Sequence, residues 1–316
     1  MRNAEAGPEA PAWVDDWLAG DRRALSRAIT ILENEGRESP ALVKAMQGLL
    51  GRAMSVGFTG PPGAGKSTLV NAFVAEQRRR GRTVGVLAVD PSSPVSGGAI
   101  LGDRIRMTGH SGDDGVFVRS LASRGHLGGL SRSAVRVMDC LDAAGLDIII
   151  LETVGAGQSE VEIADIADVK VVVAAPGLGD DVQAIKAGIL EIADILLVNK
   201  GDHPLSSQTV RHLKSMANMR PADARPPVLK ATAVTGQGVE ALADAVDEIG
   251  RSRRVSAPLA RARRLIRRAA VDLTQRRLDR VDDADIEALA QALTTGEKSV
   301  EAAAADLLGL AMRETT

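Results

Sequence analysis

Residues 60–68 read GPPGAGKST, and this stretch decides the fold. It matches the G-x-x-x-x-G-K-[ST] pattern, in which glycines let backbone N–H groups curl around phosphate oxygens and the following helix presents its positive end. An apolar run, MSVGFTG from residue 54, precedes the loop, and an amphipathic segment over 66–80 follows it. A strand before and a helix after are the context that the motif requires, so we predict a P-loop NTPase.

The side chains of this loop have separate expected roles. We expect Lys66 to reach the β and γ phosphates and to act in catalysis, and the Ser67 hydroxyl to bind Mg²⁺. The other expected nucleotide-binding positions of the loop are Gly60, Gly63, Ala64, Gly65 and Thr68.

Short apolar runs alternate with amphipathic segments through the middle of the chain. Expected strands begin near residues 54, 83, 115, 146, 169, 195 and 227, and expected helices span 66–80, 128–144, 181–193, 205–218 and 238–249. Continuous β-branched runs separated by helices predict an α/β fold with a mainly parallel sheet flanked by helices. Ligands of such sheets bind at the carboxyl ends of the strands, where the polar motifs described below also fall.

Three regions follow from the pattern: an N-terminal helical extension over 1–52, the P-loop domain over 53–250 and a C-terminal helical arm over 251–316. Residues 251–280 hold eleven arginines. They suggest either RNA or membrane binding, or a solvated helix face whose apolar seam packs on the body or on a second subunit. A net charge of −2 and only 2% aromatic residues favour the second interpretation.

Composition excludes several classes of protein. A single cysteine, Cys140, excludes an internal disulfide framework and a multi-cysteine metal site. The near-neutral charge predicts no nucleic-acid or membrane partner, and no apolar run approaches the ~20 residues of a membrane span. The N-terminus resembles neither a signal peptide nor a transit peptide, so we expect a cytoplasmic protein.

The sequence Asn199-Lys200-Gly201-Asp202 ends the sixth expected strand and matches N-K-x-D, which reads guanine. The aspartate accepts hydrogen bonds from the ring N1–H and the exocyclic amine of guanine, which adenine cannot offer, so we predict GTP rather than ATP. Thr232-Ala233 after the seventh expected strand suits a loop whose backbone touches the guanine oxygen. The alternative for Asp202 is a helix N-cap before His203-Pro204.

Three carboxylates are candidates for the metal side of the site. Asp90 ends the second expected strand, Asp103 lies in the glycine-rich GGAILGDRIRM, and Glu152 follows the apolar run LDIIIL. Mg²⁺ bound to a triphosphate is held by one or two carboxylates, often through water. The alternative for Asp90 and Glu152 is that they cap polar turns.

Ala156 stands where Ras-like proteins carry the glutamine that orients the attacking water, so we expect slow hydrolysis that a partner or a second segment completes. One candidate segment begins at Pro176 and offers two acids, an amide and a cation: Asp180, Asp181, Gln183 and Lys186. The alternative is a capped helix start, because acids are favourable at the positive end of a helix.

Four long motifs together resemble the MeaB/MMAA family, whose members also carry the labels ArgK and LAO/AO transport system kinase. The motifs are VDPSSP-x2-GGAILGDRIRM, RGHLGGL, DIIILETVGAGQSE and PGLGDD-x-Q-x-I-K-x-GILE-x-AD, and the resemblance covers nearly the whole chain. It implies a Mg²⁺-dependent GTPase that acts as a metallochaperone for adenosylcobalamin-dependent acyl-CoA mutases. GTP binding and hydrolysis in that family gate cofactor delivery and protect or rescue the mutase.

The resemblance also implies roles for individual residues. Asp90, Asp103 and Glu152 match acids around the metal, and the segment with Asp180, Asp181, Gln183 and Lys186 matches switch III, which couples partner binding to hydrolysis. It implies a homodimer through the C-terminal arm, the mutase and its adenosyltransferase as partners, and adenosylcobalamin bound only through the mutase.

The chain departs from the family pattern at Pro61-Pro62, Ala64 and Gly201, and its arm lacks the expected aromatics. The departures in the phosphate loop and in the base motif should leave nucleotide binding intact. The lack of aromatic residues in the arm affects the expected packing of the dimer. Two alternative functions stay open. One is an arginine- or ornithine-type small-molecule kinase, although no substrate base is evident beyond the switch acids. The other is a nickel-insertion GTPase, which normally needs Cys and His ligands.

Overall fold

The computed structural model describes residues 11–34, 36–90, 110, 112–122, 132–153, 166–176, 191–254, 266, 270–271, 273–275 and 277–313. Contacts divide the chain into two units, Met1–Pro258 and Leu259–Thr316, which are described separately. Asp103, Asp180, Asp181, Gln183 and Lys186, and most of the helix expected over 181–193, lie outside the described residues.

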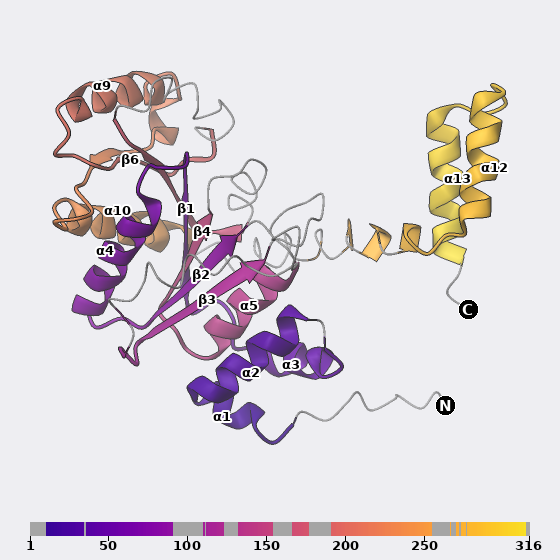
Figure 1. Ribbon diagram of the computed structural model, residues 1–316, viewed down its shortest axis with the longest axis horizontal. Helices are drawn as coiled ribbons and strands as arrows, with labels where there is room; N and C mark the ends of the chain where they lie inside the picture. The colour runs from indigo at the N-terminus through magenta and orange to yellow at the C-terminus, as the bar shows by residue number, and fades with distance from the viewer. Residues whose placement is uncertain are drawn as a thin grey trace. The chain divides into compact units, whose positions relative to one another are not determined.

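The first unit is built on a seven-stranded sheet with the order β3-β2-β4-β1-β5-β6-β7 (Figure 1), and every neighbouring pair is parallel. This confirms the predicted α/β fold, and each of the seven expected strands is present. The strands are β1 (Met54–Thr59), β2 (Val84–Asp90), β3 (Val116–Ala122), β4 (Ile148–Thr153), β5 (Val169–Ala174), β6 (Ile195–Val198) and β7 (Val228–Lys230).

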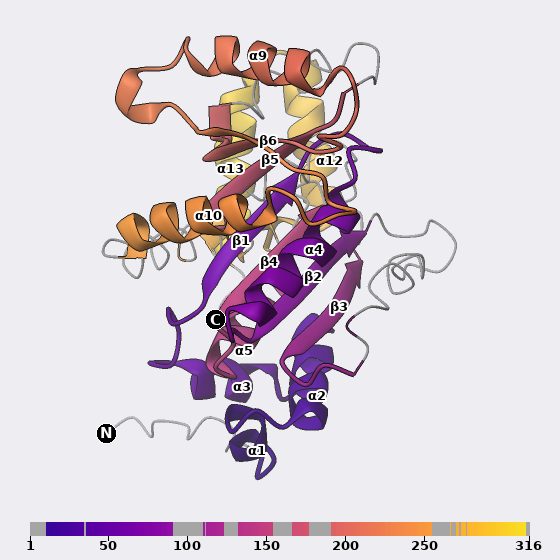
Figure 2. The same cartoon turned by 90° about the vertical axis from the view of Figure 1, so that its left-hand side faces the viewer.

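Helices cover both faces of this sheet (Figure 2). On one face α4 (Lys66–Arg79) and α10 (Val239–Arg254) pack over alternate strand residues, with Phe58 of β1 and Phe73 of α4 in edge-to-face contact at 5.4 Å between ring centroids. The opposite face is covered by α5 (Arg132–Ala143) behind β2 and β4 and by α9 (Ser206–Ala217) behind β5 and β6. A 3₁₀ turn, η2 (Ala222–Ala224), precedes β7.

The N-terminal helices α1 (Val14–Leu18), α2 (Arg22–Glu33) and α3 (Ser39–Met46) add a layer outside α5. Their apolar residues fall at helical spacing, and Trp17, Ile29 and Leu32 are fully buried against α5. The indole N–H of Trp17 donates to the Cys140 carbonyl at 3.3 Å, which satisfies the one polar atom of that buried ring. All three helices lie within the region for which the sequence predicts a helical extension.

Aspartates hold the amino ends of the strands in place. Asp147, Asp168 and Asp194 each directly precede a strand, and each accepts a hydrogen bond from a backbone N–H at the start of the neighbouring strand, at 2.8, 3.0 and 2.9 Å. Asp142 of α5 accepts from three successive N–H groups, those of residues 51–53. These bonds fix the strand register at the edge opposite the phosphate loop.

The second unit contains a hairpin of α12 (Asp283–Thr294) and α13 (Val300–Arg313), with an ion pair between Lys298 and Asp306. Several large apolar side chains of this unit are exposed, among them Ile266, Val271, Val300 and Met312. Within the described parts of both units, no helix is long and apolar enough to cross a membrane.

Candidate nucleotide-binding site

The phosphate loop leaves the sheet at its centre, because β1 lies between β4 and β5 and the loop joins β1 to α4. Two glycines allow the loop to pack there. Gly60 has φ +141°, and a Cβ on it would lie 2.1 Å from the Val173 carbonyl oxygen of β5. Gly65 has φ +82°, and a Cβ on it would lie 2.5 Å from the Asn199 amide nitrogen. Both positions therefore require glycine for its conformation and for its size.

Lys66 begins α4 and turns its side chain back over the loop. Its Nζ donates to the carbonyl oxygens of Gly60 at 2.6 Å and Pro61 at 3.0 Å, and the residue is only 6% exposed. Burying an ammonium is costly unless it is hydrogen-bonded, so the loop backbone itself stabilises the cation at this place. The positive charge and the start of α4 together make the loop attractive to an anion.

Ser67 and Glu152, two of the residues expected around Mg²⁺, lie in direct contact. The Ser67 hydroxyl donates to Glu152 Oε1 at 2.6 Å, and Glu152 is 2% exposed. The register explains the contact, because Phe58 pairs with Glu152 across β1 and β4, which places the carboxylate beside the loop that leaves β1. Two hard oxygen donors side by side fit Mg²⁺, whose other ligands would be phosphate and water oxygens.

The structure gives less information on the other two carboxylates expected near Mg²⁺, Asp90 and Asp103. Asp90 is the last residue of β2, at the same edge of the sheet as Glu152 of β4, since Ala88 pairs with Glu152. Asp103 lies outside the described residues. In the described ranges, no group of three His, Cys, Asp or Glu residues could hold a metal ion on its own.

Asn199 joins the phosphate loop to the two loops that follow β6 and β7. Its Nδ2 donates to the carbonyl oxygens of Ala64 at 3.0 Å and Gly65 at 3.2 Å, and its Oδ1 accepts from the Ala233 N–H at 3.1 Å. The residue is 2% exposed. The amide therefore uses both ends of its side chain to hold three loops in one arrangement.

Asp202, the residue that the sequence predicts to read guanine, is exposed. Asp202 makes no side-chain hydrogen bond to any residue that the structure describes, and it is not the N-cap of α9. That helix begins at Ser206, with Leu205 at the N-cap position and no side-chain cap, so the capping alternative is wrong. Lys200 adopts φ +51°, a left-handed conformation that turns the chain between β6 and Asp202.

Neighbouring residues shape the base loops. The Gly201 N–H donates to the Ala231 carbonyl at 2.9 Å, and the Ser206 hydroxyl donates to the Gly201 carbonyl at 2.9 Å. Thr232 and Ala233 are each 7% exposed, and the Thr232 N–H donates to the Gln237 carbonyl at 2.9 Å. The sequence motifs identified Thr232 and Ala233 but not Ser206 and Gln237, whose roles depend on contacts made only in the folded loops.

The other predicted loop residues differ in their exposure to solvent. Gly63 and Thr68 are exposed, and Ala64 is fully buried. A separate hollow of about 520 Å³ lies on α2 and the turn before α3, lined by Ser26, Arg27, Thr30, Ile31, Gly36, Arg37 and Glu38. It is on the opposite side of the sheet from α4 and takes no part in the nucleotide site.

Comparisons with known proteins show the family of this chain. The family described as methylmalonyl-CoA mutase-associated GTPase MeaB matches residues 25–287. A Pyrococcus horikoshii protein named as a GTPase is 48% identical over 250 residues, 78% of this chain and 79% of that protein. The GTPase ArgK of Escherichia coli is 39% identical over 237 residues, 72% of each chain.

Two further relatives extend the comparison. The mouse mitochondrial protein named methylmalonic aciduria type A homolog is 35% identical over 267 residues, 78% of this chain and 64% of that protein. A crystal structure described as an LAO/AO transport system kinase superposes with a TM-score of 0.71 at 26% identity, covering 95% of this chain and 96% of that one. The chain therefore belongs to the MeaB family of methylmalonyl-CoA mutase-associated GTPases, and it is a GTPase.

Proposed function

We propose that this GTPase is the chaperone of a B12-dependent acyl-CoA mutase, whose adenosylcobalamin loading it gates and which it protects or reactivates. The observation that carries the proposal is the match of residues 25–287 to a family described by its association with methylmalonyl-CoA mutase. The match includes most of the N-terminal helices as well as the nucleotide site. Adenosylcobalamin itself would be bound by the mutase.

We assign the nucleotide contacts as follows. The phosphate loop with Lys66 holds the phosphates, Asp202 reads guanine, and Asn199 keeps both parts of the site in register through its bonds to Ala64, Gly65 and Ala233. Ser67 and Glu152 would hold Mg²⁺, with Asp90 and Asp103 as further metal-side acids. Bound Mg²⁺ would offset charge on the phosphates during hydrolysis.

Hydrolysis by the isolated protein should be slow. The phosphate and metal sides are organised by the chain itself, but Ala156 cannot orient water as a glutamine does. We assign completion of the site to the partner, acting through the segment with Asp180, Gln183 and Lys186. A homodimer formed through an arm beginning near residue 251, a cytoplasmic location and contact with the adenosyltransferase belong to the same proposal.

The structure bears on one alternative. Nickel insertion normally uses cysteine and histidine ligands, and Cys140 is fully buried within the core between α5 and the N-terminal helices. Burial raises the pKa of its thiol well above the usual range, which disfavours the thiolate that binds metals. The single cysteine therefore does not suit a nickel site.

The proposal is tested by GTP turnover with purified B12-dependent acyl-CoA mutases added singly. We expect a slow basal rate that rises severalfold with the cognate mutase and stays unchanged with the others. Fast turnover that no acyl-CoA mutase alters would contradict the chaperone function. Labelled GTP supplied with arginine or ornithine separates the kinase alternative, because only a kinase forms a phosphorylated amino acid.

A further inference from the structure

The exposed apolar residues of the first unit are confined to one short part of the chain. Among its described residues the large hydrophobic side chains that are exposed are Leu205, Met219 and Val234, with 48%, 81% and 87% of their surface accessible. All three lie between residues 205 and 234, in the part of the chain that runs from the turn before α9, through α9 and β7, to the loop after β7. Exposed apolar side chains gathered in one segment are typical of an interaction site.

The same segment carries an unbalanced positive charge. Between residues 199 and 230 there are six Lys or Arg residues and two Asp residues, in a protein whose net charge is −2. None of these six cations forms an ion pair with a residue that the structure describes, and residues 199–230 themselves are described without gaps. The cations are Lys200, Arg211, Lys214, Arg220, Arg225 and Lys230.

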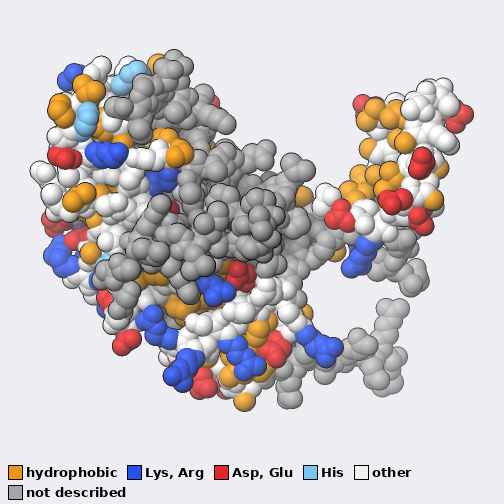
Figure 3. Space-filling view, viewed as in Figure 1, with side chains coloured by type: hydrophobic (Ala, Val, Ile, Leu, Met, Phe, Trp, Pro, Cys, Tyr) orange, Lys and Arg blue, Asp and Glu red, His pale blue; other side chains and the backbone are white. Residues whose placement is uncertain are grey.

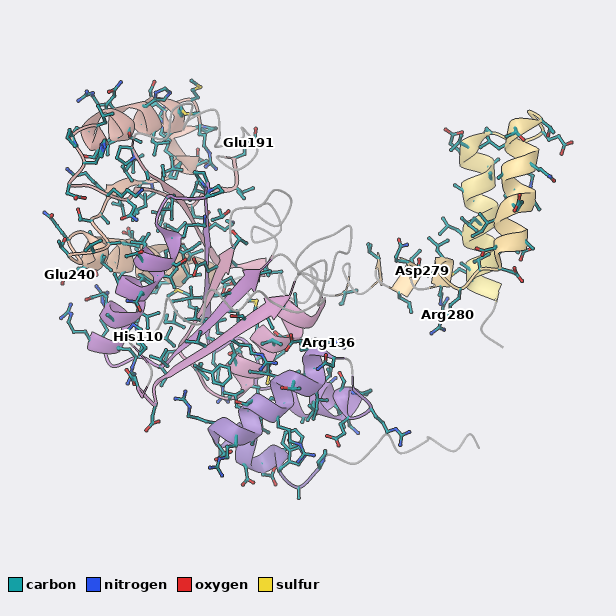
Figure 4. All side chains as sticks on the ribbon, in the orientation of Figure 1. His110, Arg136, Glu191, Glu240, Asp279 and Arg280 are labelled. Atoms are coloured by element: carbon teal, nitrogen blue, oxygen red, sulfur yellow. The ribbon has the colours of Figure 1, made fainter. Side chains whose placement is uncertain are left out.

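The layer formed by α4 and α10 shows the contrast. Its four neighbouring arginines, at positions 78, 79, 80 and 82, all pair with carboxylates, which include Glu76 and Asp247. Arg79 also pairs with Glu240, which is labelled in Figure 4. The chain thus neutralises its cations where helices pack together and leaves them unpaired along α9. Both layers belong to the same unit, so overall composition does not explain the difference.

The geometry of α9 places these groups on its outer face. Its buried residues, Ser206, Leu213 and Ala217, face the sheet. Arg211 and Lys214 are three residues apart and therefore lie on one side of the helix, and both are exposed. Leu205 and Met219 flank the helix at its two ends. Figure 3 shows cationic, histidine and hydrophobic side chains interspersed over this helix.

We propose that this α9 surface, defined by Leu205, Arg211, His212, Lys214 and Met219, docks on a carboxylate-rich surface of the mutase. The inference rests on the proposed function and names the contact through which the partner engages. The unpaired cations are complementary to carboxylates, and exposed Met219 supplies an adaptable apolar anchor. Methionine and arginine are both enriched in protein–protein interfaces.

A protein partner fits this surface better than a nucleic acid or a membrane. Residues 199–230 contain no Phe, Trp or Tyr to stack on bases or to anchor at a lipid interface. Two cations at the end of α9 already contact backbone carbonyls: Arg220 donates to Ala193, and Arg225 donates to Arg220 and Asn218. These two are partly committed to the fold. Of the other four cations, Arg211 and Lys214 are the two that lie within α9, and we assign them to the partner.

The α9 surface is also connected to the nucleotide site. Ser206, the first residue of α9, donates its hydroxyl to the carbonyl oxygen of Gly201 in the base loop at 2.9 Å. The Gly201 N–H in turn donates to Ala231, next to Thr232 and Ala233. A partner bound to α9 would therefore alter the positions of the loops after β6 and β7, which we expect to contact guanine. Mutase binding and nucleotide affinity would then be coupled.

The test measures the affinity of the full-length protein for its cognate mutase, by biolayer interferometry in the presence of GDP. For Arg211→Glu/Lys214→Glu we expect affinity to fall by about 10-fold or more at low salt, with the loss shrinking at about 0.5 M salt. Met219→Ala should weaken binding by about 5-fold. Basal GTP turnover should be unchanged in both variants.

Arg23→Glu/Lys44→Glu is the matched control, because it makes the same charge change at exposed cations of α2 and α3. Its affinity should match that of wild type. If wild type binds the mutase and the α9 variants bind equally well, the docking surface is wrong and the chaperone function stands. If wild type binds no B12-dependent acyl-CoA mutase, the proposed function fails first. Binding of wild type, but not the α9 double variant, to double-stranded DNA or phosphatidylserine vesicles, with mutase affinity unchanged, would also overturn the inference.

Discussion

The nucleotide site has two corners that the protein prepares differently. In the phosphate corner, formed by Lys66, Ser67 and Glu152, the carboxylate is 2% exposed and already accepts a hydrogen bond from Ser67. In the base corner, formed by Lys200 and Asp202, the carboxylate is exposed and makes no hydrogen bond to the residues described. The fold buries and orients the carboxylate of the first corner, whereas the carboxylate of the second corner is open to solvent. Changes in the first should therefore alter catalysis, and changes in the second should alter selectivity.

Among the substitutions in the two corners, Lys66→Ala in the phosphate corner should lower the rate of GTP hydrolysis most. It removes the buried ammonium that lies against the Gly60 and Pro61 carbonyls and that would contact the β and γ phosphates. We expect the rate of phosphate release to fall by about 10³-fold, because charge that develops on the phosphates loses its donor. Arg79→Ala on the exposed side of α4 is the control and should keep the wild-type rate. A Lys66 variant with unchanged turnover would remove the phosphate-loop assignment.

Asp202→Asn should alter selectivity without altering chemistry. The amide can donate to the exocyclic oxygen of xanthine but no longer accepts both guanine hydrogen bonds. We expect the ratio of GTP to XTP affinity to fall by about 100-fold. The turnover rate at saturating XTP should approach that of wild type with GTP. Competition binding with a fluorescent nucleotide measures the ratio, and a ratio that stays at the wild-type value would exclude Asp202 as the guanine reader.

Glu152→Gln tests how strongly Mg²⁺ binding depends on the negative charge of the buried carboxylate. The amide keeps the shape and can still accept from Ser67, so the fold should be preserved. The loss of one negative charge should raise the Mg²⁺ concentration for half-maximal turnover by roughly 30-fold. GDP affinity measured in EDTA should not change. If the Mg²⁺ requirement stays the same, Glu152 acts only to position Ser67.

Much of the fold could be predicted because its signals are local. The β-branched runs that form β4 and β5 are buried on both faces, and their pattern requires no knowledge of neighbours. The end of α10 could not be predicted in this way. The sequence predicted a helix over 238–249, but the helix continues to Arg254. A Cβ at 250 would lie 2.0 Å from Met54 Sδ, so glycine is needed there for packing and not as a cap.

The residues of the candidate site also differ in whether a local sequence pattern can identify them. Motif spacing identified Lys66, Ser67 and Asp202, because each belongs to a short continuous pattern. The bonds from Asn199 to Ala64 and Gly65 join positions 134 or more residues apart, and they depend on β1, β5 and β6 being neighbours in the sheet. No local pattern reports such a contact.

Asn199→Ala tests whether the two corners depend on one another, because the Asn199 side chain contacts the loops of both. The substitution removes donors to Ala64 and Gly65 and the acceptor for the Ala233 N–H, so the phosphate loop and the base loops lose their common support. We expect affinity for GTP and GDP to fall by the same factor, about 10-fold, and the free energy of unfolding to fall by about 2 kcal/mol. Equal losses follow because the amide reaches no atom that distinguishes the two nucleotides.

Isothermal titration with GDP and with a non-hydrolysable GTP analogue, together with urea unfolding, measures both quantities for Asn199→Ala. Asn218→Ala, at the end of α9, is the matched control, because its side chain makes no hydrogen bond to the described residues. A loss confined to the GTP analogue would assign Asn199 to the phosphate corner alone. A change in GTP over XTP preference with unaltered stability would assign it to the base corner. Only equal losses, accompanied by lower stability, fit an amide that holds the two corners at a fixed spacing.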